Sequence, residues 1–365
     1  MLATQRPIIG VLIKESVIKR LMRQKINFQC YPRLLHLAIA SKEAEVTLYF
    51  FSPQNANDIR ETIIGTFYDP KDHLWKQKKF LLPDVLYNRG GGRVNRIFLD
   101  FLEQKKVIKF NPQSFDKWDV YTKLQNFSEI QGFLPFTKLY QKDQDIIDFL
   151  ETHNEVYLKG VRGGKGTQIF HVSKLPENRY EYSHCVGKMF IEEVNNTDDL
   201  LKRIHEFYKG RQFIIQKPID LIKLSDSRID FRAELQRNGL GELTISGVMA
   251  RIGKSQSPIT IHSSAYPVEM FFKEFLNYSD EKIQELTGII HDFLFTIYKA
   301  LEKAYGIFGE IGIDFGIDTS GNIWFIEPNA KSAKVSLMKA YDEKTIHQAF
   351  LKPLQFARYL YFCKR

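Results

Sequence analysis

The stretch that decides the fold is GEIGIDFGIDTSGNIWFIEPNAKS, residues 309–332, in which two apolar runs flank a short polar segment. Isoleucine and phenylalanine alternate with glycine and aspartate in the first run, which is typical of a strand with one buried face. The pattern predicts a β-hairpin with its turn centred on Ser320 and Gly321. This register pairs Asp314 with Glu327 across the two strands.

Two opposed carboxylates create an electrostatic conflict. Directly opposed side chains have Cβ atoms about 4.5 to 5.5 Å apart, and two carboxylates that close repel unless a proton or cation lies between them. Asn329 returns to the same face by strand alternation and adds an amide oxygen. These are the hard oxygen ligands that Mg²⁺ prefers, so Asp314, Glu327 and Asn329 are predicted metal ligands. An ordinary amphipathic hairpin with solvated acids is the alternative at this point.

The composition predicts a globular protein of two or three domains, because 365 residues with 44% hydrophobic and 26% charged residues can bury a sizeable core. The N-terminal apolar run is too short for a signal peptide or membrane span, so we expect a cytoplasmic protein. Cys30, Cys185 and Cys363 lack disulfide or zinc spacing and are expected to be buried thiols. A net charge of +9 favours acidic partners, although a solvated basic surface accounts for most of the lysines.

The first 110 residues predict a small open α/β domain. Residues 7–13 and 46–52 have the character of buried strands, and the segment between them has helical spacing. Strand, helix and strand in this order form a parallel unit. Further along, the glycines of residues 90–92 follow a strand but lack nucleotide-binding spacing, and positive φ angles explain them equally well. Arg89 and Arg93 beside this loop are candidates for holding an acidic substrate, and Arg228 and Arg251 further along the chain could line the same cleft.

A second glycine-rich segment, EVYLKGVRGGKGTQIFHVS, predicts a hairpin in which strand 156–159 is followed by an antiparallel strand 167–172. Backbone N–H groups of its glycines can approach phosphate oxygens, while Lys159 supplies a fixed positive charge. The loop leads into a strand rather than a helix, which disfavours a P-loop. A mobile surface hairpin with solvated lysines is the alternative.

Three later segments complete the pattern. Residues 212–216 predict a strand that ends at Lys217 and Pro218, which leaves backbone groups available to an adenine edge. RIDFRAEL and LTISGVMARIG predict two alternating strands, and a ladder of surface ion pairs is the usual meaning of their charges. The polar members of these strands are Arg228, Asp230, Arg232 and Arg251. Residues 281–306 predict a core helix that closes on a glycine.

In chain order these segments resemble the ATP-grasp superfamily over residues 111–335. The matching positions are Asp116-Lys117, Lys159 with its glycine hairpin, Gln216-Lys217-Pro218-Ile219, Asp230-x-Arg232, Arg251, Asp314 and Glu327-x-Asn329. The combination of LPDVLYNRGGG, YLKGVRGGKG, RIDFRAELQRNG and GIDFGIDTSGNIWFIEPNAKS is similar to the YheC/YheD family of endospore coat-associated ATP-grasp proteins. The implied fold class is α/β (α+β): an N-terminal open α/β pre-ATP-grasp domain, residues 1–110, a first ATP-grasp subdomain with a lid, residues 111–218, and a second with the metal-binding hairpin and a C-terminal helix, residues 219–365.

The resemblance also implies ATP and Mg²⁺ as cofactors and a role for each matching residue. The implied roles are phosphate binding by Lys117 and Lys159, a lid formed by Gly163, Gly164, Lys165 and Gly166, adenine recognition by Gln216, Lys217, Pro218 and Ile219, ribose binding by Asp230, metal binding by Asp314, Glu327 and Asn329, and catalysis by Arg251 and Lys159. Two departures stand out. Lys217 lies where most members carry an acid, and Ser263 and Ser264 replace a glycine pair of peptide ligases.

The implied activity is that of an ATP-dependent carboxylate–amine ligase that works through an acyl-phosphate and releases ADP. Its substrate is expected to be an acidic small molecule, a peptide or a coat-protein carboxylate, in a cytoplasmic protein linked to the spore coat. The alternative is a non-catalytic nucleotide-binding coat component that acts by assembly. No recognisable nucleic-acid-binding module is present in the sequence.

Overall fold

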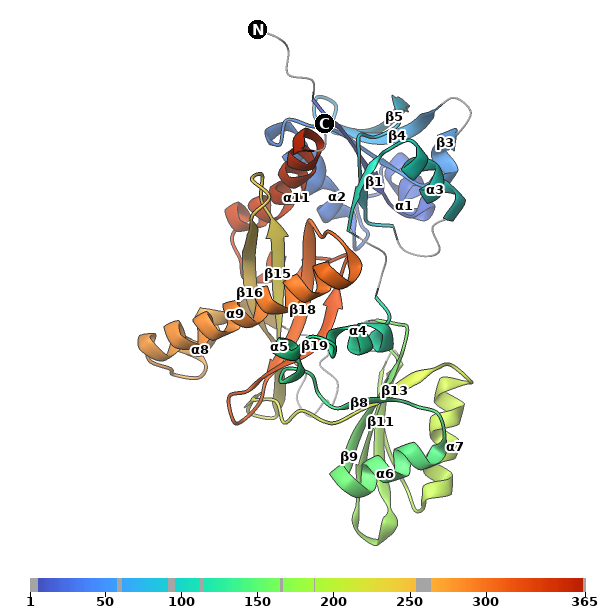
Figure 1. Cartoon of the computed structure of the whole chain (residues 1–365), viewed down its shortest axis with the longest axis vertical. Helices are drawn as coiled ribbons and strands as arrows, with labels where there is room; N and C mark the ends of the chain where they lie inside the picture. Colours follow the sequence, from blue (N-terminus) through green and yellow to red (C-terminus); the bar gives the residue numbers. More distant parts are fainter. Residues whose placement is uncertain are drawn as a thin grey trace.

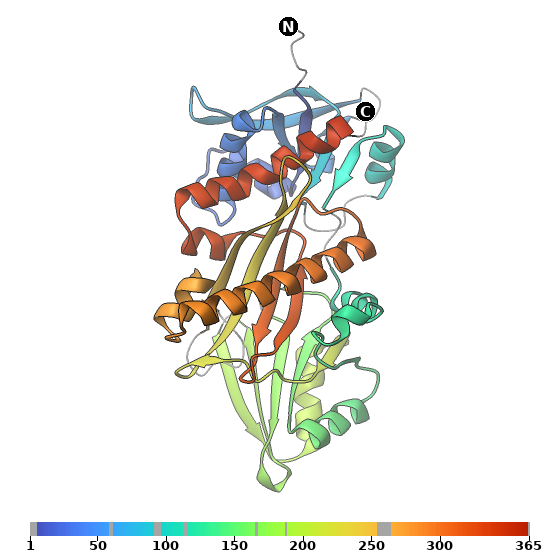
Figure 2. The same ribbon diagram turned by 60° about the vertical axis from the view of Figure 1, so that its left-hand side comes forward.

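The protein consists of three β-sheets that follow one another along the long axis of the molecule in a computed structural model (Figure 1). The structure describes residues 6–57, 61–90, 96–111, 115–164, 167–186, 188–253 and 264–363. The first sheet lies at one end, the second sheet at the other end and the third sheet between them, as a second view also shows (Figure 2).

The first sheet is mixed. In spatial order its strands are β3 (Ala56–Asn57), β4 (Thr62–Asp69), β2 (Thr47–Phe51), β1 (Ile8–Leu12), β6 (Val85–Asn88) and β7 (Ile108–Phe110), and β5 (Leu74–Leu81) pairs with β4. Strands β1, β2, β6 and β7 are parallel, which confirms the predicted strand–helix–strand unit. The antiparallel β4–β5 hairpin was not predicted.

Helices cover both faces of the first sheet. α1 (Glu15–Met22) and α2 (Tyr31–Glu43) pack on one face and α3 (Arg96–Gln104) on the other. The C-terminal helix α11 (Glu343–Cys363) joins the α2 side, so the two ends of the chain share a core. A 3₁₀ turn, η1 (Pro53–Asn55), links β2 to β3.

The second sheet is antiparallel, and the helices that pack on it in the described residues lie on one face. Its strands, in order, are β12 (Lys188–Val194), β11 (Tyr180–Val186), β10 (Ile169–Lys174), β9 (Glu155–Gly160), β13 (Phe213–Gln216) and β8 (Thr137–Leu139), with η2 (Pro176–Asn178) between β10 and β11. The predicted β9–β10 hairpin is confirmed. α6 (Asp143–His153) and α7 (Thr197–Tyr208) pack on its apolar face. The polar side chains of Lys159, His171 and Gln216 belong to the opposite face.

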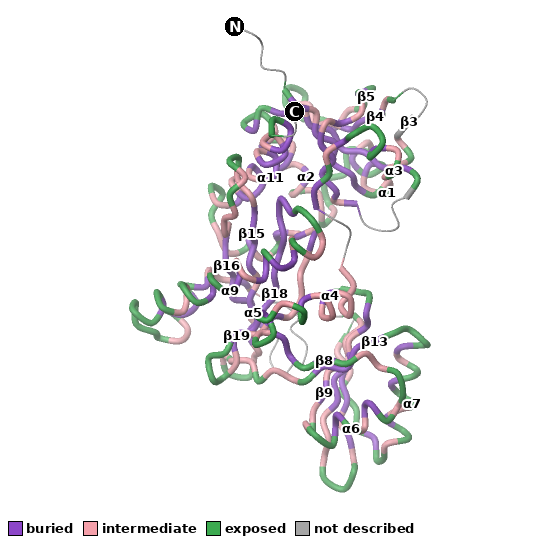
Figure 3. Tube along the Cα trace, viewed as in Figure 1, coloured by how far each residue is buried: buried purple, intermediate pink, exposed green. Residues whose placement is uncertain are grey.

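The third sheet has the order β17 (Ser264–Pro267), β16 (Leu243–Ile252), β15 (Ser227–Arg237), β18 (Glu310–Ile317) and β19 (Ile323–Asn329), with β14 (Lys223–Leu224) beside β15. Helices α4 (Lys117–Leu124), α5 (Ser128–Gln131), α8 (Val268–Glu274) and α9 (Asp280–Tyr305) pack on its apolar face, and α10 (Val335–Ala340) lies beside β16 and β17. α9 confirms the predicted core helix ending before Gly306. β15 and β18 are buried along most of their length (Figure 3).

The β18–β19 hairpin has the predicted pairing at its functional end. Asp314 pairs with Glu327, and Asn329 lies two residues further along the same strand. At the turn end the register differs by one residue from the predicted one, because Ile317 pairs with Ile323 instead of Trp324. A β-bulge just beyond Asp314 absorbs the extra residue and restores the predicted register.

The predicted domain boundaries at residues 110 and 218 stay predictions. Hydrophobic cores cross the sheets, because α4 and α5 pack on the third sheet and α11 packs on the first. Among the described helices, none combines the length and apolarity that crossing a membrane requires.

Candidate functional site

Lys117 lies where three elements of the candidate site meet. It begins α4, because the Asp116 carboxylate caps the helix by accepting hydrogen bonds from the N–H groups of the second and third helical residues at 3.1 and 3.2 Å. Its Nζ lies 3.3 Å from Glu327 Oε2 and donates to the carbonyl of Gly163 at 3.2 Å. The helix start, the hairpin and the glycine loop are therefore joined by one ammonium group.

Lys159 is fixed on β9 by a short polar chain. Its Nζ donates to Gln216 Oε1 at 2.6 Å, and the Gln216 amide donates to Thr137 Oγ1 at 2.9 Å. Burial lowers the pKa of Lys159 to about 8, the neighbouring Lys117 adds to this, and Glu327 opposes it. The Lys159 ammonium group is thus poorly solvated and has a pKa close to neutral pH. A bound anion would stabilise its charged form.

Asp314 is surrounded by arginines. Arg232 pairs with both of its oxygens, with Nη2–Oδ2 at 2.8 Å, and Arg251 Nη2 lies 3.3 Å from Oδ2. Arg251 also donates from Nε to Asp230 at 2.6 Å. Burial would lower the pKa of Arg232, but Asp314 more than offsets this and raises it. Arg232 therefore keeps its charge although it is buried.

We call Lys117, Lys159, Arg232, Arg251, Asp314 and Glu327 the hairpin cluster. It brings four cations and two carboxylates together from α4, β9, β15, β16, β18 and β19. Arg232 was quoted in the sequence motif without a role, although strand alternation puts it on the same face as Asp230. Even when Asp230, the partner of Arg251, is added, four cations face three carboxylates, so the cluster suits a polyanion.

The metal-ligand prediction can be tested on donor chemistry. Asp314 and Glu327 are directly opposed, and the Asn329 side-chain amide lies 3.5 Å from Asp314 Oδ2. In the described part of the chain no three residues of the His, Cys, Asp and Glu types gather, so the set consists of two carboxylates and an amide. Such a set suits a hard divalent cation that takes its remaining ligands from a bound anion.

The other predicted residues divide into two groups. Lys217, Pro218 and Ile219 carry the chain from β13 toward the third sheet, where Leu221 forms a bridge with Asp318. The N–H of Lys217 donates to the Phe136 carbonyl at 2.9 Å, and its side chain is exposed. Gly163 has a φ of 144°, which favours glycine, and the space beside Gly164 is open. The second group, Lys165 and Gly166 of the lid together with Arg93 and Ser263, lies outside the described residues.

A cavity of about 450 Å³ lies elsewhere, along α4, α5 and the start of β8. Its lining residues are Tyr121, Gln125, Asn126, Gln131, Leu134 and Phe136. None of the predicted site residues lines it. The hairpin cluster, with its opposed charges, remains the better candidate site.

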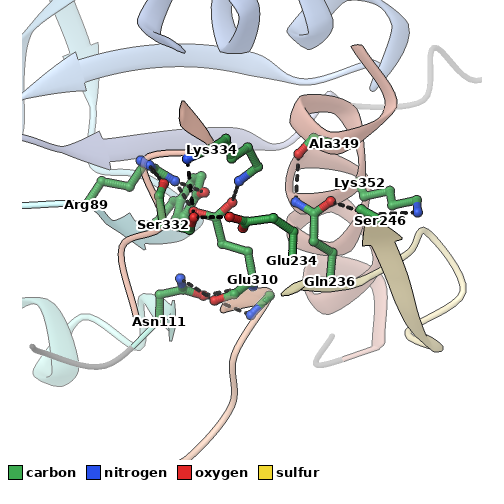
Figure 4. Close-up of polar contacts among 12 residues, drawn as sticks. Arg89, Asn111, Glu234, Gln236, Ser246, Glu310, Ser332, Lys334, Ala349 and Lys352 are labelled. Atoms are coloured by element: carbon green, nitrogen blue, oxygen red, sulfur yellow. Dashed lines mark hydrogen bonds and ion pairs between the residues drawn. The ribbon is translucent and has the colours of Figure 1, made fainter. Parts of the chain in front are cut away.

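A second charged group, missed in the sequence, lies where the third sheet meets the first (Figure 4). We call it the interface cluster, and its members are Arg89, Glu234, Glu310, Ser332 and Lys334. Glu310 pairs with both Arg89 and Lys334, and Ser332 donates to Glu234. The side chains of Glu310 and Lys334 are both 0% exposed. A signal was available, because charged residues at alternate positions of otherwise apolar strands often indicate buried pairs.

The arginines proposed for an acidic substrate are engaged inside the protein. Arg89 pairs with Glu310 and donates to the carbonyl of Ser332 at 2.7 Å. Arg228 donates to the Tyr157 hydroxyl and lies 3.4 Å from Glu155. These two side chains therefore tie parts of the protein together, which weakens the argument that they are free cations awaiting an anionic chain.

The sequence profile described as YheC/D-like ATP-grasp matches residues 106–360. The chain belongs to this family. It is 24% identical over 295 residues to the endospore coat-associated protein YheD of Bacillus subtilis (strain 168), covering 78% of this chain but only 64% of YheD. It is 21% identical over 339 residues to YheC of the same organism, covering 89% of this chain and 91% of YheC. The family predicted from the sequence is confirmed.

The fold is also similar to that of a solved ligase. The VanG D-Ala:D-Ser ligase from Enterococcus faecalis is 14% identical, with a TM-score of 0.58, over 98% of this chain and 100% of that chain. At this identity the likeness shows the fold alone. The predicted fold class, an α/β chain with an ATP-grasp fold, is confirmed.

Proposed function

We propose that this YheC/D-like ATP-grasp protein is a Mg²⁺- and ATP-dependent carboxylate–amine ligase that works through an acyl-phosphate. The observation that carries the proposal is the hairpin cluster, in which Lys117 and Lys159 come within reach of Glu327 while Arg232 and Arg251 bracket Asp314. Catalysis of phosphoryl transfer rests on positioning and charge neutralisation rather than on a protein nucleophile. The cluster supplies both.

The residues would act as follows. Lys117 and Lys159 bind the triphosphate, and Gln216 orients Lys159 through its 2.6 Å hydrogen bond. Lys217, Pro218 and Ile219 border the adenine through backbone groups, and the glycine loop that includes Gly163 and Gly164 covers the phosphates together with Lys165 and Gly166. Asp230 meets the ribose, in keeping with the resemblance. Asp314, Glu327 and Asn329 would hold Mg²⁺, which when bound supplies additional neutralisation of phosphate charge.

The reaction would have two balanced steps. An oxygen of the substrate carboxylate attacks the γ-phosphorus, the bond from the γ-phosphorus to the β–γ bridging oxygen breaks, and ADP leaves with the electron pair. The amine nitrogen of the acceptor then attacks the acyl carbon and loses a proton as the C–O bond to phosphate breaks. Arg251 is suited to stabilise the transferred phosphoryl group, because it lies beside Asp314 at the centre of the cluster.

The substrate that carries the carboxylate and the acceptor amine would be components of the spore coat. This part of the proposal is supported by the two relatives, whose names describe endospore coat-associated proteins. A peptide or coat-protein carboxylate is therefore the first substrate class to try, followed by acidic small molecules.

The test is an ADP-release screen with Mg·ATP in which amino acids, acidic peptides and coat extracts serve as substrates. We expect release to depend on both a carboxylate and an amine, and Lys159→Met to abolish it. Arg251→Lys keeps a cation between Asp230 and Asp314 and should lower turnover more than it lowers ATP affinity. Tight Mg·ATP binding without stimulated ADP release would contradict the ligase proposal and support a nucleotide-binding coat component that acts by assembly.

A further inference from the structure

The net charge of the chain is concentrated in its first 110 residues. Residues 1–110 contain 19 of the 52 lysines and arginines and 10 of the 43 acidic residues, whereas residues 111–365 contain 33 of each. The excess of +9 therefore belongs to the N-terminal segment, and the segment with the hairpin cluster is neutral. This segment forms the end of the molecule opposite the second sheet (Figures 1 and 2).

The outer edge of the first sheet at this end is strand β5. In the part of the chain that the structure describes, β5 pairs with β4 alone. At Trp75 a side chain imitates a further strand: the Gln24 amide donates to the Trp75 carbonyl at 2.8 Å and accepts from its N–H at 3.0 Å. The backbone groups of Trp75 therefore point outward and bind an amide.

Other residues of β5 also direct their backbone N–H and C=O groups away from β4. In an antiparallel ladder, every second residue directs both backbone groups away from its partner strand, so Gln77 and Lys79 point outward like Trp75. Within the described residues, no strand pairs with this side of β5. The side chains of Gln77 and Lys79 are exposed. The edge is thus a short unfilled template for an extended peptide.

Unpaired cations surround the template. Lys78 and Lys79 are exposed, and within the described residues neither forms an ion pair, although Lys78 lies over aromatic rings. Arg23 and Lys25 flank Gln24 on the chain and are exposed. By contrast, Lys76 already pairs with two aspartates. The cations left over lie along the same edge as the outward backbone groups.

We propose that the β5 edge binds an extended acidic peptide, which adds to the first sheet as a further strand. Its backbone would pair with Gln77 and Lys79, and its carboxylates would meet Lys78, Lys79 and the cations beside Gln24. Edge lysines also prevent aggregation between sheets, because like charges oppose each other. The same repulsion disfavours β5 of a second copy as the occupant and leaves an acidic strand as the complementary one. The inference does not rest on the proposed ligase activity.

The experiment measures binding of a fluorescein-labelled peptide of alternating glutamate and valine by anisotropy, at low and at physiological salt, with an alternating lysine–valine peptide for comparison. We expect the acidic peptide alone to bind, and more weakly at the higher salt. The double variant Lys78→Glu, Lys79→Glu should weaken binding by at least about tenfold, because it reverses two charges at the edge.

Gln77→Pro distinguishes strand addition from charge attraction. Proline removes one outward N–H without changing the charge, and an edge strand tolerates it on its open side. We expect this variant to lose binding about as strongly as the charge variant. Gln77→Ala loses the same side-chain hydrogen bond to Thr66, 3.1 Å long, but keeps the N–H, so it should bind the peptide as the wild type does and should share any stability change caused by loss of that bond. Wild-type affinity in Gln77→Pro would overturn the proposal, as would displacement of the peptide by duplex DNA or anionic vesicles at equal charge concentration.

The matched control is Lys202→Glu, a charge reversal at an exposed position of α7 in the second sheet's helical layer. It should bind the peptide as the wild type does, and an equal loss there would contradict a site on β5. Mg·ATP affinity should be unchanged in all these variants. This separates the failure of the peptide site from the failure of the proposed nucleotide site.

Discussion

Strand β18 carries two acidic residues on one face, and their surroundings differ. Glu310, in the interface cluster, is 0% exposed and is closed off by Arg89 and Lys334. Asp314, four residues along, is paired with arginines, but the Glu327 opposite it is 27% exposed and shares its cation, Lys117, with a loop carbonyl. A buried pair of this kind cannot lose one partner cheaply, because the remaining charge is left buried without compensation. Charged groups that are partly exposed, such as Lys117 and Glu327, can instead give up a contact within the protein and bind a ligand.

Lys334 of the interface cluster and Lys159 of the hairpin cluster differ in the same way as these carboxylates. Lys334 lies within a pair and is completely buried, and burial lowers its pKa to about 7 while Glu234 opposes the shift. Within the described residues, the Lys159 ammonium group donates only to a neutral amide oxygen and forms no ion pair. We therefore expect the loss of Lys334 to affect folding and the loss of Lys159 to affect ligand binding.

The largest effect is expected for Lys334→Met. The change leaves Glu310 buried with Arg89 alone, and breaking a buried pair in this way costs about 3 to 5 kcal/mol of unfolding free energy. Urea denaturation would measure the loss. Lys339→Met, at an exposed position of α10, the helix that Lys334 precedes as its N-cap residue, is the control and should stay within about 0.5 kcal/mol of the wild type.

The double variant Glu310→Gln, Lys334→Met sharpens this prediction. The loss in the double variant should be smaller than the sum of the losses in Glu310→Gln and Lys334→Met, because the two residues form one ion pair and removing either already breaks it. A loss of less than about 1 kcal/mol in Lys334→Met would mean that the interface cluster is not a structural pair.

The next effect concerns Lys159→Met in the hairpin cluster. ATP affinity should fall by about 1.5 to 3 kcal/mol, the usual value of a charged hydrogen bond, while the unfolding free energy stays the same or rises slightly. Isothermal titration calorimetry and urea denaturation would give the two quantities. Lys188→Met on the outer strand β12 is the control, and Lys117→Met should have a smaller effect than Lys159→Met because Lys117 is more loosely held. A stability loss as large as that of Lys334→Met would remove the distinction between the clusters.

A smaller effect is expected for Glu327→Gln, which keeps the shape of the side chain and removes its charge. The gain in ATP affinity that Mg²⁺ provides over EDTA should shrink by about tenfold or more. Because Glu327 is partly exposed, the fold should tolerate the change. Glu274→Gln on α8 serves as the control, and an undiminished Mg²⁺ effect in Glu327→Gln would refute the metal assignment.

The sequence was sufficient to predict the Asp314–Glu327 pairing of the hairpin cluster but not the interface cluster, and the reason is sequence separation. The pairing of Asp314 with Glu327 depends on a local turn and the two-residue period of a strand, both of which can be read along the chain. The pairing of Arg89 with Glu310 joins residues 221 positions apart and depends on how the first and third sheets pack. The β4–β5 hairpin was missed because LWKQKKFL has too few alternating apolar residues to indicate a strand.

Nucleotide binding should depend on pH through Lys159, because burial favours its neutral form whereas a bound triphosphate favours its charged form. Its pKa is lowered to about 8 in the folded protein, so below that pH the folded state carries a charge that burial disfavours. Stability from this group therefore rises as the pH increases through 8 toward the ordinary value of 10.5, by at most about 1.4 kcal/mol per pH unit.

ATP affinity should change in the opposite direction, because the triphosphate prefers the protonated lysine. We expect it to fall by up to about tenfold between pH 7 and pH 9, since a group with a pKa of 8 loses most of its charge over this range. Calorimetry across this range in the wild type and in Lys159→Met would test both signs at once. A variant that keeps the full pH dependence would show that another group is responsible, and then Lys117, which shares Glu327, would be the next to replace.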